Sequence, residues 1–411
     1  MPKKIGRGNT IFYLFLLRNY FTMIDKNIFV QQIILSLGDE SVYNFLKGKK
    51  IMSAVFVSEN KNQILGLVYD LPMKLENSEK IIFPEDASAE WETKKTIDKI
   101  CETWSELGFS VILFPLDSTF LTKWSDFSSQ CTLIHSLAEG WGSLARESWI
   151  PSLCELSGVP FIGSDPYAHS ICMSKTQLKL LCNLLKIPTS PFYIIKNIKD
   201  FGKIPSTFFK ETHFIKPDGE GSGMGIDASY SISNSKSEAE DKVKILLEKY
   251  PDGVLIEKYL NGREFTSGII GTPPLFLPIA EIEVEDKIYG LANKSKEMMG
   301  EKVTFPKLSK KDENLVKNSS QILFNYLNLK DLVRMDWRCD ENGNLYFLEA
   351  NTLPGISFYY SVLPLMAKQI GIHYKDFYSL IAKSALSRDL TRNLWYGKMR
   401  IQKKSSKREN F

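Results

Sequence analysis

Two carboxylates and one amide in the carboxyl-terminal third of the chain could together bind a divalent metal ion. Asp336 lies within 332–339, where residues alternate as in a β-strand. The Asn-Gly pair that follows is typical of a hairpin turn, and 345–348 predicts the returning strand. Because side chains alternate between the faces of a strand, Asp336 and Glu349 can face one space, with Asn351 just beyond. Carboxylate and amide oxygens suit Mg²⁺ that is shared with phosphates.

The same periodicity predicts the neighbours of these oxygens. Arg334 falls on the face of Asp336, where its guanidinium would add a fixed planar positive charge. On the returning strand, Phe347 and Glu349 are predicted to share a face. A hairpin whose charged side chains are simply solvated is the alternative interpretation.

A glycine-rich loop at 219–225 follows a predicted strand that ends at Lys216 and Pro217. Its backbone N–H groups could approach phosphate oxygens closely, because glycine carries no side chain. The loop fits neither the dinucleotide-binding pattern G-x-G-x-x-G nor the P-loop, since no G-K-[ST] follows it. Taken alone, it is equally well interpreted as a flexible turn.

The sequence EANTLPG at 349–355 resembles the signature of the D-alanine–D-alanine ligase group of the ATP-grasp superfamily. The resemblance extends in register over roughly 64–385. It implies a mixed α/β ATP-grasp fold, in which a small doubly wound amino-terminal domain and two α+β domains enclose ATP. It also implies an ADP-forming ligase that joins a carboxylate to an amine through an acyl phosphate.

The resemblance implies which residues would bind ATP with Mg²⁺ or Mn²⁺. Three lysines would contact the phosphates: Lys175, Lys216 and Lys294. The adenine and ribose would be bound by side chains or backbone of Glu257, Lys258, Leu260 and Glu264. The metal ligands would be the three residues described above: Asp336, Glu349 and Asn351.

Five residues are implied for the substrates and for acyl transfer. Ser222 matches the loop serine that supports substrate binding, and Ser361 matches the serine that receives a substrate carboxylate. Arg334 and a backbone N–H near Gly355 would stabilise the oxyanion. The family's Gly-Gly-x-Ser loop, with its ammonium-binding glutamate, has no match after the first strand, and Glu92 is the nearest replacement.

Two further departures leave the substrate pair open. The family usually has a tyrosine close to its loop lysine, whereas here Ser295 follows that lysine directly. The family's histidine after the third strand is also absent, and Glu139 occupies the region. The alternatives are therefore true D-alanine–D-alanine ligase activity, a ligase for another amino acid or peptide, or a nucleotide-binding module without catalysis. A biotin-type carboxylase would normally have a longer chain with carrier domains.

Predicted strands and helices distribute these residues over three domains. Strands alternating with helices over 63–173 predict a small parallel sheet in an amino-terminal substrate domain. We expect an ATP lid subdomain at 174–272 and a subdomain with the metal site at 273–385. The remainder is an extension of unknown role at 1–62 and a basic tail at 386–411. Helices are predicted at 88–107, 146–156, 175–185 and 239–249.

The composition of the 411 residues is that of an ordinary globular protein, with 43% hydrophobic and 24% charged residues. The net charge of +4 gives no indication of nucleic-acid binding, and no run of 18 apolar residues predicts a membrane span. Six cysteines without a C-x-x-C pair favour free thiols in a reducing compartment. We therefore expect a cytoplasmic enzyme for small amino-acid or peptide substrates, with a homodimer as a further expectation.

Overall fold

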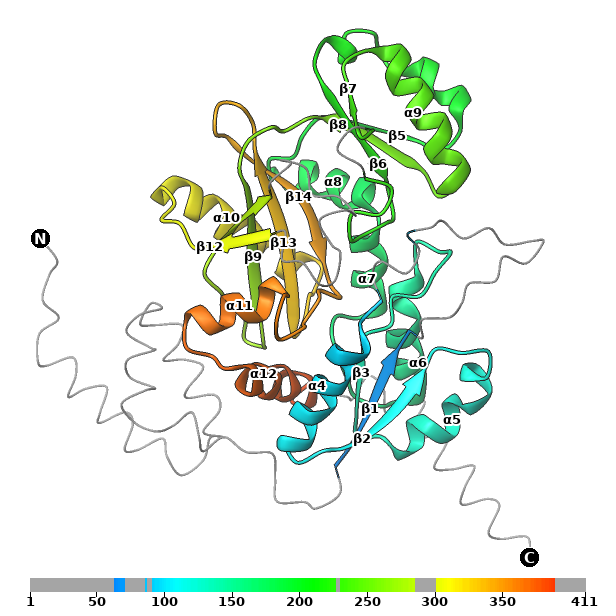
Figure 1. Cartoon of the computed structure of the whole chain (residues 1–411), viewed down its shortest axis with the longest axis vertical. Coiled ribbons are helices and arrows are strands. Elements are labelled where there is room, and N and C mark those ends of the chain that lie inside the picture. Colours follow the sequence, from blue (N-terminus) through cyan, green and yellow to red (C-terminus); the bar gives the residue numbers. More distant parts are fainter. Residues whose placement is uncertain (1–62, 71–85, 87–90, 227–229, 285–300, 389–411) are drawn as a thin grey trace, which may run out of the picture. The chain divides into compact units, whose positions relative to one another are not determined.

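The computed structural model describes residues 63–70, 86, 91–226, 230–284 and 301–388 (Figure 1). The chain divides into two units, Met1–Glu59 and Asn60–Phe411, and every described residue belongs to the second. The predictions for the extension at 1–62, for Lys294 and Ser295, and for the tail beyond Arg388 lie outside the described residues.

The amino-terminal part contains, among the described residues, a parallel sheet of four strands in the order β2-β1-β3-β4. A parallel strand that is covered on both faces needs a continuous apolar run, and Leu65, Leu67 and Val68 are fully buried. This sheet confirms the predicted alternation. Its strands are β1 (Ile64–Tyr69), β2 (Ser110–Pro115), β3 (Leu133–Ser136) and β4 (Phe161–Ile162). Its helices are α4 (Lys94–Glu106), α5 (Phe120–Gln130) and α6 (Trp149–Ser157).

Helix starts in this part differ from the prediction. Helix α4 begins at Lys94 rather than at 88, because the Thr93 hydroxyl caps it by accepting a hydrogen bond from the Thr96 backbone N–H. The helix predicted at 146–156 opens with a 3₁₀ turn, η2 (Arg146–Ser148), before α6. Helix α5 lies in a segment for which no helix was predicted.

The middle of the chain forms a second sheet, whose described strands follow the antiparallel order β5-β8-β6-β7. Helix α9 (Lys236–Lys249) packs on it through Ala239, Val243 and Leu246. The strands are β5 (Phe192–Ile195), β6 (His213–Pro217), β7 (Ile232–Ser233) and β8 (Val254–Lys258). Helices α7 (Pro166–Met173) and α8 (Lys175–Leu184) precede the sheet.

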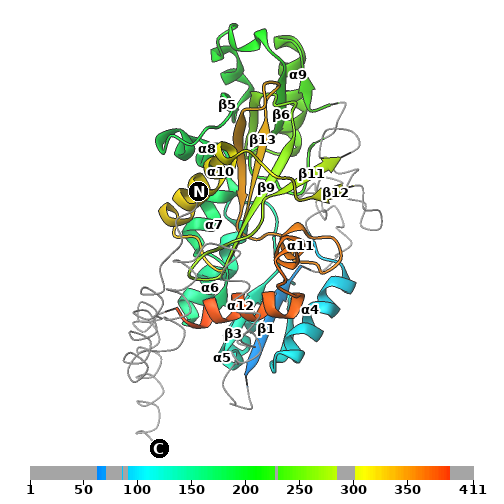
Figure 2. The same ribbon diagram turned by 90° about the vertical axis from the view of Figure 1, so that its left-hand side faces the viewer.

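The third sheet has the order β12-β11-β9-β13-β14, with β10 beside β9. Its strands are β9 (Glu264–Ile270), β10 (Leu275–Phe276), β11 (Ala280–Val284), β12 (Glu301–Thr304), β13 (Leu332–Cys339) and β14 (Leu345–Asn351). The helices of this part are α10 (Lys310–Tyr326), α11 (Val362–Gln369) and α12 (Tyr374–Leu386). Figures 1 and 2 show β13 beside β14, and α12 beside α4.

Strand β9 corrects the predicted boundary between the lid and the metal subdomain. The predicted lid range 174–272 includes β9, but this strand pairs along its length with β13 in the third sheet. Its alternation of buried side chains predicts a strand without indicating its partner, because pairing is decided by hydrogen bonds between distant segments. The lid sheet therefore ends with β8.

A β-bulge in the hairpin of β13 and β14 changes which side chains share a face. Asp336 pairs with Glu349, as predicted, but the next pair is Trp337 with Phe347, so Leu348 is an extra residue. Phe347 is therefore fully buried in the core beside Trp337, whereas Glu349 lines a cavity. The predicted common face of Phe347 and Glu349 is wrong, because strict alternation does not hold across a bulge.

None of the helices in the described ranges is both long and apolar enough to span a bilayer.

Candidate functional site

A cavity of about 920 Å³ brings together residues from all three sheets and the loops around them. Its size lies within the range of small-molecule sites. The predicted site residues that line it are Glu92, Lys175, Lys216, Ser222, Glu264, Arg334, Asp336, Glu349, Asn351, Gly355 and Ser361. Three others, Glu257, Lys258 and Leu260, are described but are absent from this lining.

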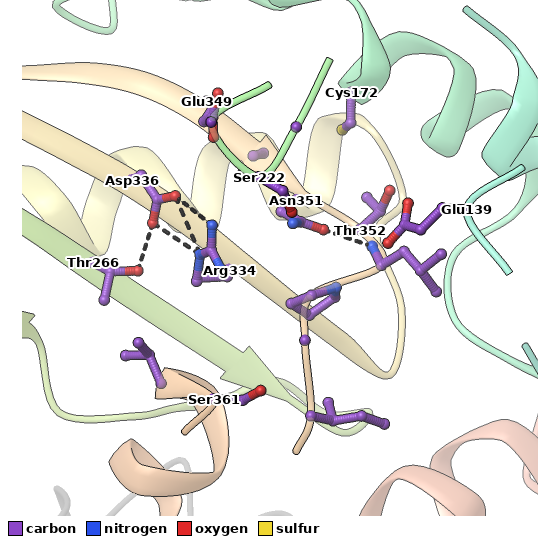
Figure 3. A pocket seen from close by; sticks show the side chains of 18 of the residues that line it. Glu139, Cys172, Ser222, Thr266, Arg334, Asp336, Glu349, Asn351, Thr352 and Ser361 are labelled. Carbon is purple, nitrogen blue, oxygen red and sulfur yellow. Dashed lines mark hydrogen bonds and ion pairs between the residues drawn. The ribbon is translucent and has the colours of Figure 1, made fainter. Parts of the chain in front are cut away.

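Asp336 is fixed at the cavity by one neighbour on its own strand, β13, and by one on the adjacent strand β9. The Arg334 guanidinium donates to it, with 3.1 Å from Nε to Oδ1 and 2.9 Å from Nη2 to Oδ2. Thr266 on β9 donates its hydroxyl to Oδ1 at 2.7 Å (Figure 3). Beside this pair, the Asn351 amide oxygen accepts the Leu353 N–H at 2.9 Å, which shapes the turn after β14. Strand pairing places Arg334 opposite Asn351.

Glu349 is the second carboxylate of the predicted metal set, and it carries a negative charge at neutral pH. Its Oε2 lies 3.4 Å from the Lys175 Nζ. Burial alone would raise the pKa of Glu349, but the charges of Lys175, Lys216 and Arg334 outweigh it and hold the pKa below its usual value. The described residues contain no cluster of three His, Cys, Asp or Glu side chains suited to a metal. The predicted set instead combines two carboxylates with an amide, a donor chemistry that fits Mg²⁺.

Lys175 is positioned by the start of α8, which is tied to the glycine-rich loop. Asp218 accepts hydrogen bonds from the Ser174 hydroxyl at 2.6 Å and from the Thr176 backbone N–H at 2.7 Å. The Lys175 Nζ itself donates to the carbonyl oxygen of Glu220 in the loop. The helix N-terminus, its first lysine and the loop are therefore held together, and phosphate binding by this arrangement stays a prediction.

Glu257 is buried between two lysines rather than exposed in the cavity. Its Oε1 lies 2.7 Å from the Lys216 Nζ and its Oε2 lies 2.7 Å from the Lys179 Nζ. Ser190 also donates to Oε2, at 2.6 Å. Burial opposes ionisation, but the two lysine charges hold the pKa of Glu257 well below its ordinary value. In this structure the carboxylate orients Lys216; its predicted contact with adenine stays a prediction.

The side chains of Lys258 and Leu260 also lie away from the cavity. The Lys258 Nζ pairs with Glu211 at 2.7 Å, and Leu260 is buried. Both were predicted to contact adenine through the backbone, so these placements leave that prediction open.

Glu264, the predicted ribose ligand, faces the cavity beside Arg338. The Arg338 Nη1 donates to its Oε2 at 3.1 Å. Burial, with the nearby charges of Asp336 and Glu349, raises the pKa of Glu264 to about 7, against the opposing effect of Arg338. The carboxyl group is therefore divided between its neutral and charged forms near neutral pH.

This pKa predicts a pH dependence that Glu264→Gln should remove. Between the ordinary glutamate pKa of about 4.3 and about 7, the folded protein binds a proton that the unfolded chain has lost. The free energy of unfolding should therefore fall as pH rises through this interval and level off above it. Thermal melts of both proteins without nucleotide or metal, at about pH 5 and about pH 8, test this. Equal changes in the two proteins would contradict the assignment.

The opposite side of the cavity is built by α4 and by the loop after β14. Glu92 precedes α4 and accepts a hydrogen bond from the Tyr360 hydroxyl at 2.8 Å. The Ser361 Oγ accepts the Ser357 N–H at 2.8 Å. A Cβ atom at position 355 would lie 3.0 Å from this Oγ, so the close approach favours Gly355. Glu92, Gly355 and Ser361 therefore line the same cavity, and their roles toward the substrates stay predictions.

Several buried polar residues at the site were not predicted. Lys179 could have been found, because it follows Lys175 by one helical turn and so lies on the same face of α8. Arg146 contacts the glycine-rich loop and Glu147 contacts Thr352, and in both cases the partner is distant in the sequence. No local pattern in the sequence marks such contacts.

The comparisons with known proteins concern the family and the fold of the chain. The family model described as D-ala D-ala ligase C-terminus matches residues 186–383. The D-alanine–D-alanine ligase of Aquifex aeolicus is 28% identical over 290 residues, covering 70% of this chain and 93% of that protein. The D-alanine–D-alanine ligase of Bacillus anthracis, crystallised with ATP, aligns with a TM-score of 0.59 at 19% identity over 79% of this chain and 97% of that one.

A second solved structure supports the same fold. D-alanyl-alanine synthetase A of Vibrio cholerae aligns with a TM-score of 0.64 at 17% identity, covering 80% of this chain and 99% of that one. These structural alignments confirm the predicted ATP-grasp fold. Together with the family model over 186–383 and the signature at 349–355, they make the chain similar to the D-alanine–D-alanine ligases of the ATP-grasp superfamily.

Proposed function

We propose that this protein is an ATP-dependent ligase that joins a carboxylate to an amine through an acyl phosphate. One observation carries the proposal: Asp336, Glu349 and Asn351 line the same cavity as Lys175 and Lys216. Oxygen ligands for a metal and cations for phosphates are thus combined in one place, as transfer of a phosphoryl group requires. ATP would bind with Mg²⁺ or Mn²⁺, which would neutralise charge on its phosphates when bound.

In the proposed first step, a carboxylate oxygen of the substrate attacks the γ-phosphorus of ATP. The bond from that phosphorus to the bridging oxygen breaks, which gives an acyl phosphate and ADP. Lys175 and Lys216 would hold the phosphates, since both ammonium groups are buried at the cavity and neither has to be ordered during the reaction. In such transfers, positioning of the reactants and neutralisation of their charge supply most of the rate acceleration.

In the second step, the amine of the other substrate attacks the acyl carbon. A tetrahedral oxyanion forms, and the amine loses a proton to the departing phosphate or to solvent. The bond from the acyl carbon to the phosphate oxygen then breaks, which re-forms the carbonyl and releases inorganic phosphate and the amide. Arg334 and a backbone N–H near Gly355 would stabilise the oxyanion, a contribution typically worth about 3–4 kcal/mol for one donor. Arg334 is already oriented by its hydrogen bonds to Asp336, so little reorganisation is needed.

The charge distribution of the cavity favours amino-acid substrates. Lys175, Lys216 and Arg334 line the cavity together with the carboxylates Glu264, Asp336 and Glu349, and the amino-terminal domain contributes Lys95 and three further carboxylates: Glu92, Glu139 and Glu147. An amino acid could direct its carboxylate to the cations and its ammonium group to the carboxylates of the amino-terminal domain. Ser222 and Ser361 would add hydrogen bonds to the substrates.

A phosphate-release assay over a panel of D- and L-amino acids tests the proposal. We expect release that requires ATP, a divalent metal and two amino acids together. Dependence on two D-alanines would identify the narrower activity of a D-alanine–D-alanine ligase, whereas release with another pair would identify a variant ligase. Binding of ATP without release for any pair would favour a nucleotide-binding module that does not catalyse the reaction.

A homodimer and a cytoplasmic location are part of the same proposal. The six free cysteines support a reducing compartment. Light scattering of the purified full chain tests the dimer, and fractionation of cells that express it tests the location.

A further inference from the structure

A buried arginine of the amino-terminal domain reaches across to the glycine-rich loop. Arg146 begins the turn η2 and is only 2% exposed. Its Nη1 donates to the carbonyl oxygen of Gly219 at 3.0 Å, and its Nη2 donates to the Glu220 carboxylate at 3.0 Å. The planar guanidinium thus binds two consecutive loop residues at once, which fixes orientation as well as distance.

Other contacts hold the same end of the loop. Leu144 packs so closely on Gly219 that a Cβ atom there would lie 2.2 Å from the leucine Cδ2. The carbonyl oxygen of Glu220 accepts a hydrogen bond from the Lys175 Nζ. Glu220 is therefore held through its side chain by Arg146 and through its backbone by a predicted phosphate ligand.

Glu147, the next residue of the turn η2, contacts Thr352 just after β14. The Glu147 Oε2 accepts the Thr352 hydroxyl at 3.3 Å and lies 3.1 Å from the His169 Nδ1. Thr352 directly follows Asn351, and Figure 3 shows the two residues adjacent at the cavity. Two neighbouring side chains of η2 thus contact the loop and the end of β14.

We propose that Arg146 is a positioning residue that seats the glycine-rich loop over the phosphates of the nucleotide. The inference rests on the proposed function, because it takes the loop as the phosphate cover. Arg146 acts through Glu220 and Gly219, and it touches neither ATP nor the reacting atoms. Weakening the ion pair between Arg146 and Glu220 should therefore weaken nucleotide binding more than it slows the chemical step.

The variants Glu220→Gln, Arg146→Met and Arg146→Lys test this, with Glu281→Gln as the matched control. Glu281 also accepts from an arginine, Arg263, at 2.6 Å, but the described lining of the cavity does not include it. Glu220→Gln keeps the shape of the side chain and so remains informative if Arg146→Met does not fold. Binding of the non-hydrolysable analogue adenylyl imidodiphosphate with Mg²⁺, measured by calorimetry, is a readout that does not need catalysis.

We expect the analogue to bind about 10- to 100-fold more weakly to Glu220→Gln and Arg146→Met. Arg146→Lys should lose less affinity for the analogue, because lysine keeps the positive charge but lacks the planar guanidinium that binds two loop residues at once. The double variant should bind the analogue no more weakly than Arg146→Met alone, since Arg146→Met already removes the contact that Glu220→Gln weakens. In phosphate release, the KM for ATP should rise while kcat changes less than about threefold.

Three results would overturn the inference. The first is that the folded Glu220→Gln protein binds the analogue as tightly as Glu281→Gln does. The second is that the two single effects add in the double variant. The third is that melting temperatures fall while nucleotide affinity is unchanged, which would leave Arg146 a purely structural role. Absence of binding to the unaltered chain would instead reject the proposed function, and this inference with it.

Discussion

Replacing Glu349 with alanine is expected to abolish ATP-dependent phosphate release. Glu349 is the anionic ligand that β14 contributes to the proposed metal site, opposite Asp336 on β13. Loss of a residue that only supports a metal ligand costs about 10- to 100-fold in activity, so loss of the ligand itself should cost more. The variant also leaves Lys175 without its carboxylate partner at 3.4 Å, which should change how the phosphates are held.

The fold of Glu349→Ala should survive, because the side chain lies at the cavity and is 27% exposed. The control is Glu341→Ala, which removes an exposed carboxylate from the turn of the same hairpin. Glu349→Asp keeps the charge on a shorter side chain and should retain part of the activity, with a weaker apparent affinity for Mg²⁺. Phosphate release against Mg²⁺ concentration, with thermal melts of each protein, measures both effects. Full activity in a correctly folded Glu349→Ala protein would reject the metal assignment.

The hairpin shows how far strand periodicity can predict a site. Alternation on the two strands predicts that Asp336 and Glu349 can face one space with Asn351 just beyond, and the strand pairing puts Asp336 opposite Glu349 and Arg334 opposite Asn351. The same rule failed at Phe347, because one extra residue in β14 lets that ring pack against Trp337, with the ring centroids 5.3 Å apart. A bulge depends on how two strands fit a core, and the pattern of one strand does not contain that information.

Buried charges were the least predictable part of the site. Only the family resemblance predicts Lys175 and Lys216 as phosphate ligands, whereas the helical spacing of Lys179 after Lys175 on α8 is a local signal. The contacts of Arg146 join residues more than seventy positions apart in the sequence. Such pairs follow from the docking of whole domains, so residue type and local spacing give no indication of the partner.

A loss of stability is expected when Glu257 is replaced with glutamine. Glu257 is 3% exposed and separates two buried ammonium groups, Lys179 and Lys216, each 2.7 Å away. Removing the negative charge takes from each lysine the carboxylate that it contacts at 2.7 Å, in a medium of low polarity. Breaking a buried pair in this way typically costs about 3–5 kcal/mol of unfolding free energy. We expect a clearly lower melting temperature and faster proteolysis in the lid sheet.

The stabilising effect of Glu257 should also depend on pH. Because its pKa is lowered in the folded state, the contribution is fully present above the ordinary glutamate pKa and is lost as pH falls below it. The melting temperatures of the unaltered protein and Glu257→Gln should therefore converge at acid pH. Lys179→Met is the matched variant: it keeps the pair between Glu257 and Lys216, so it should cost less stability than Glu257→Gln. If Glu257 served only to bind adenine, Glu257→Gln would weaken ATP binding and leave the melting temperature unchanged, which would refute this account of the lysine pair.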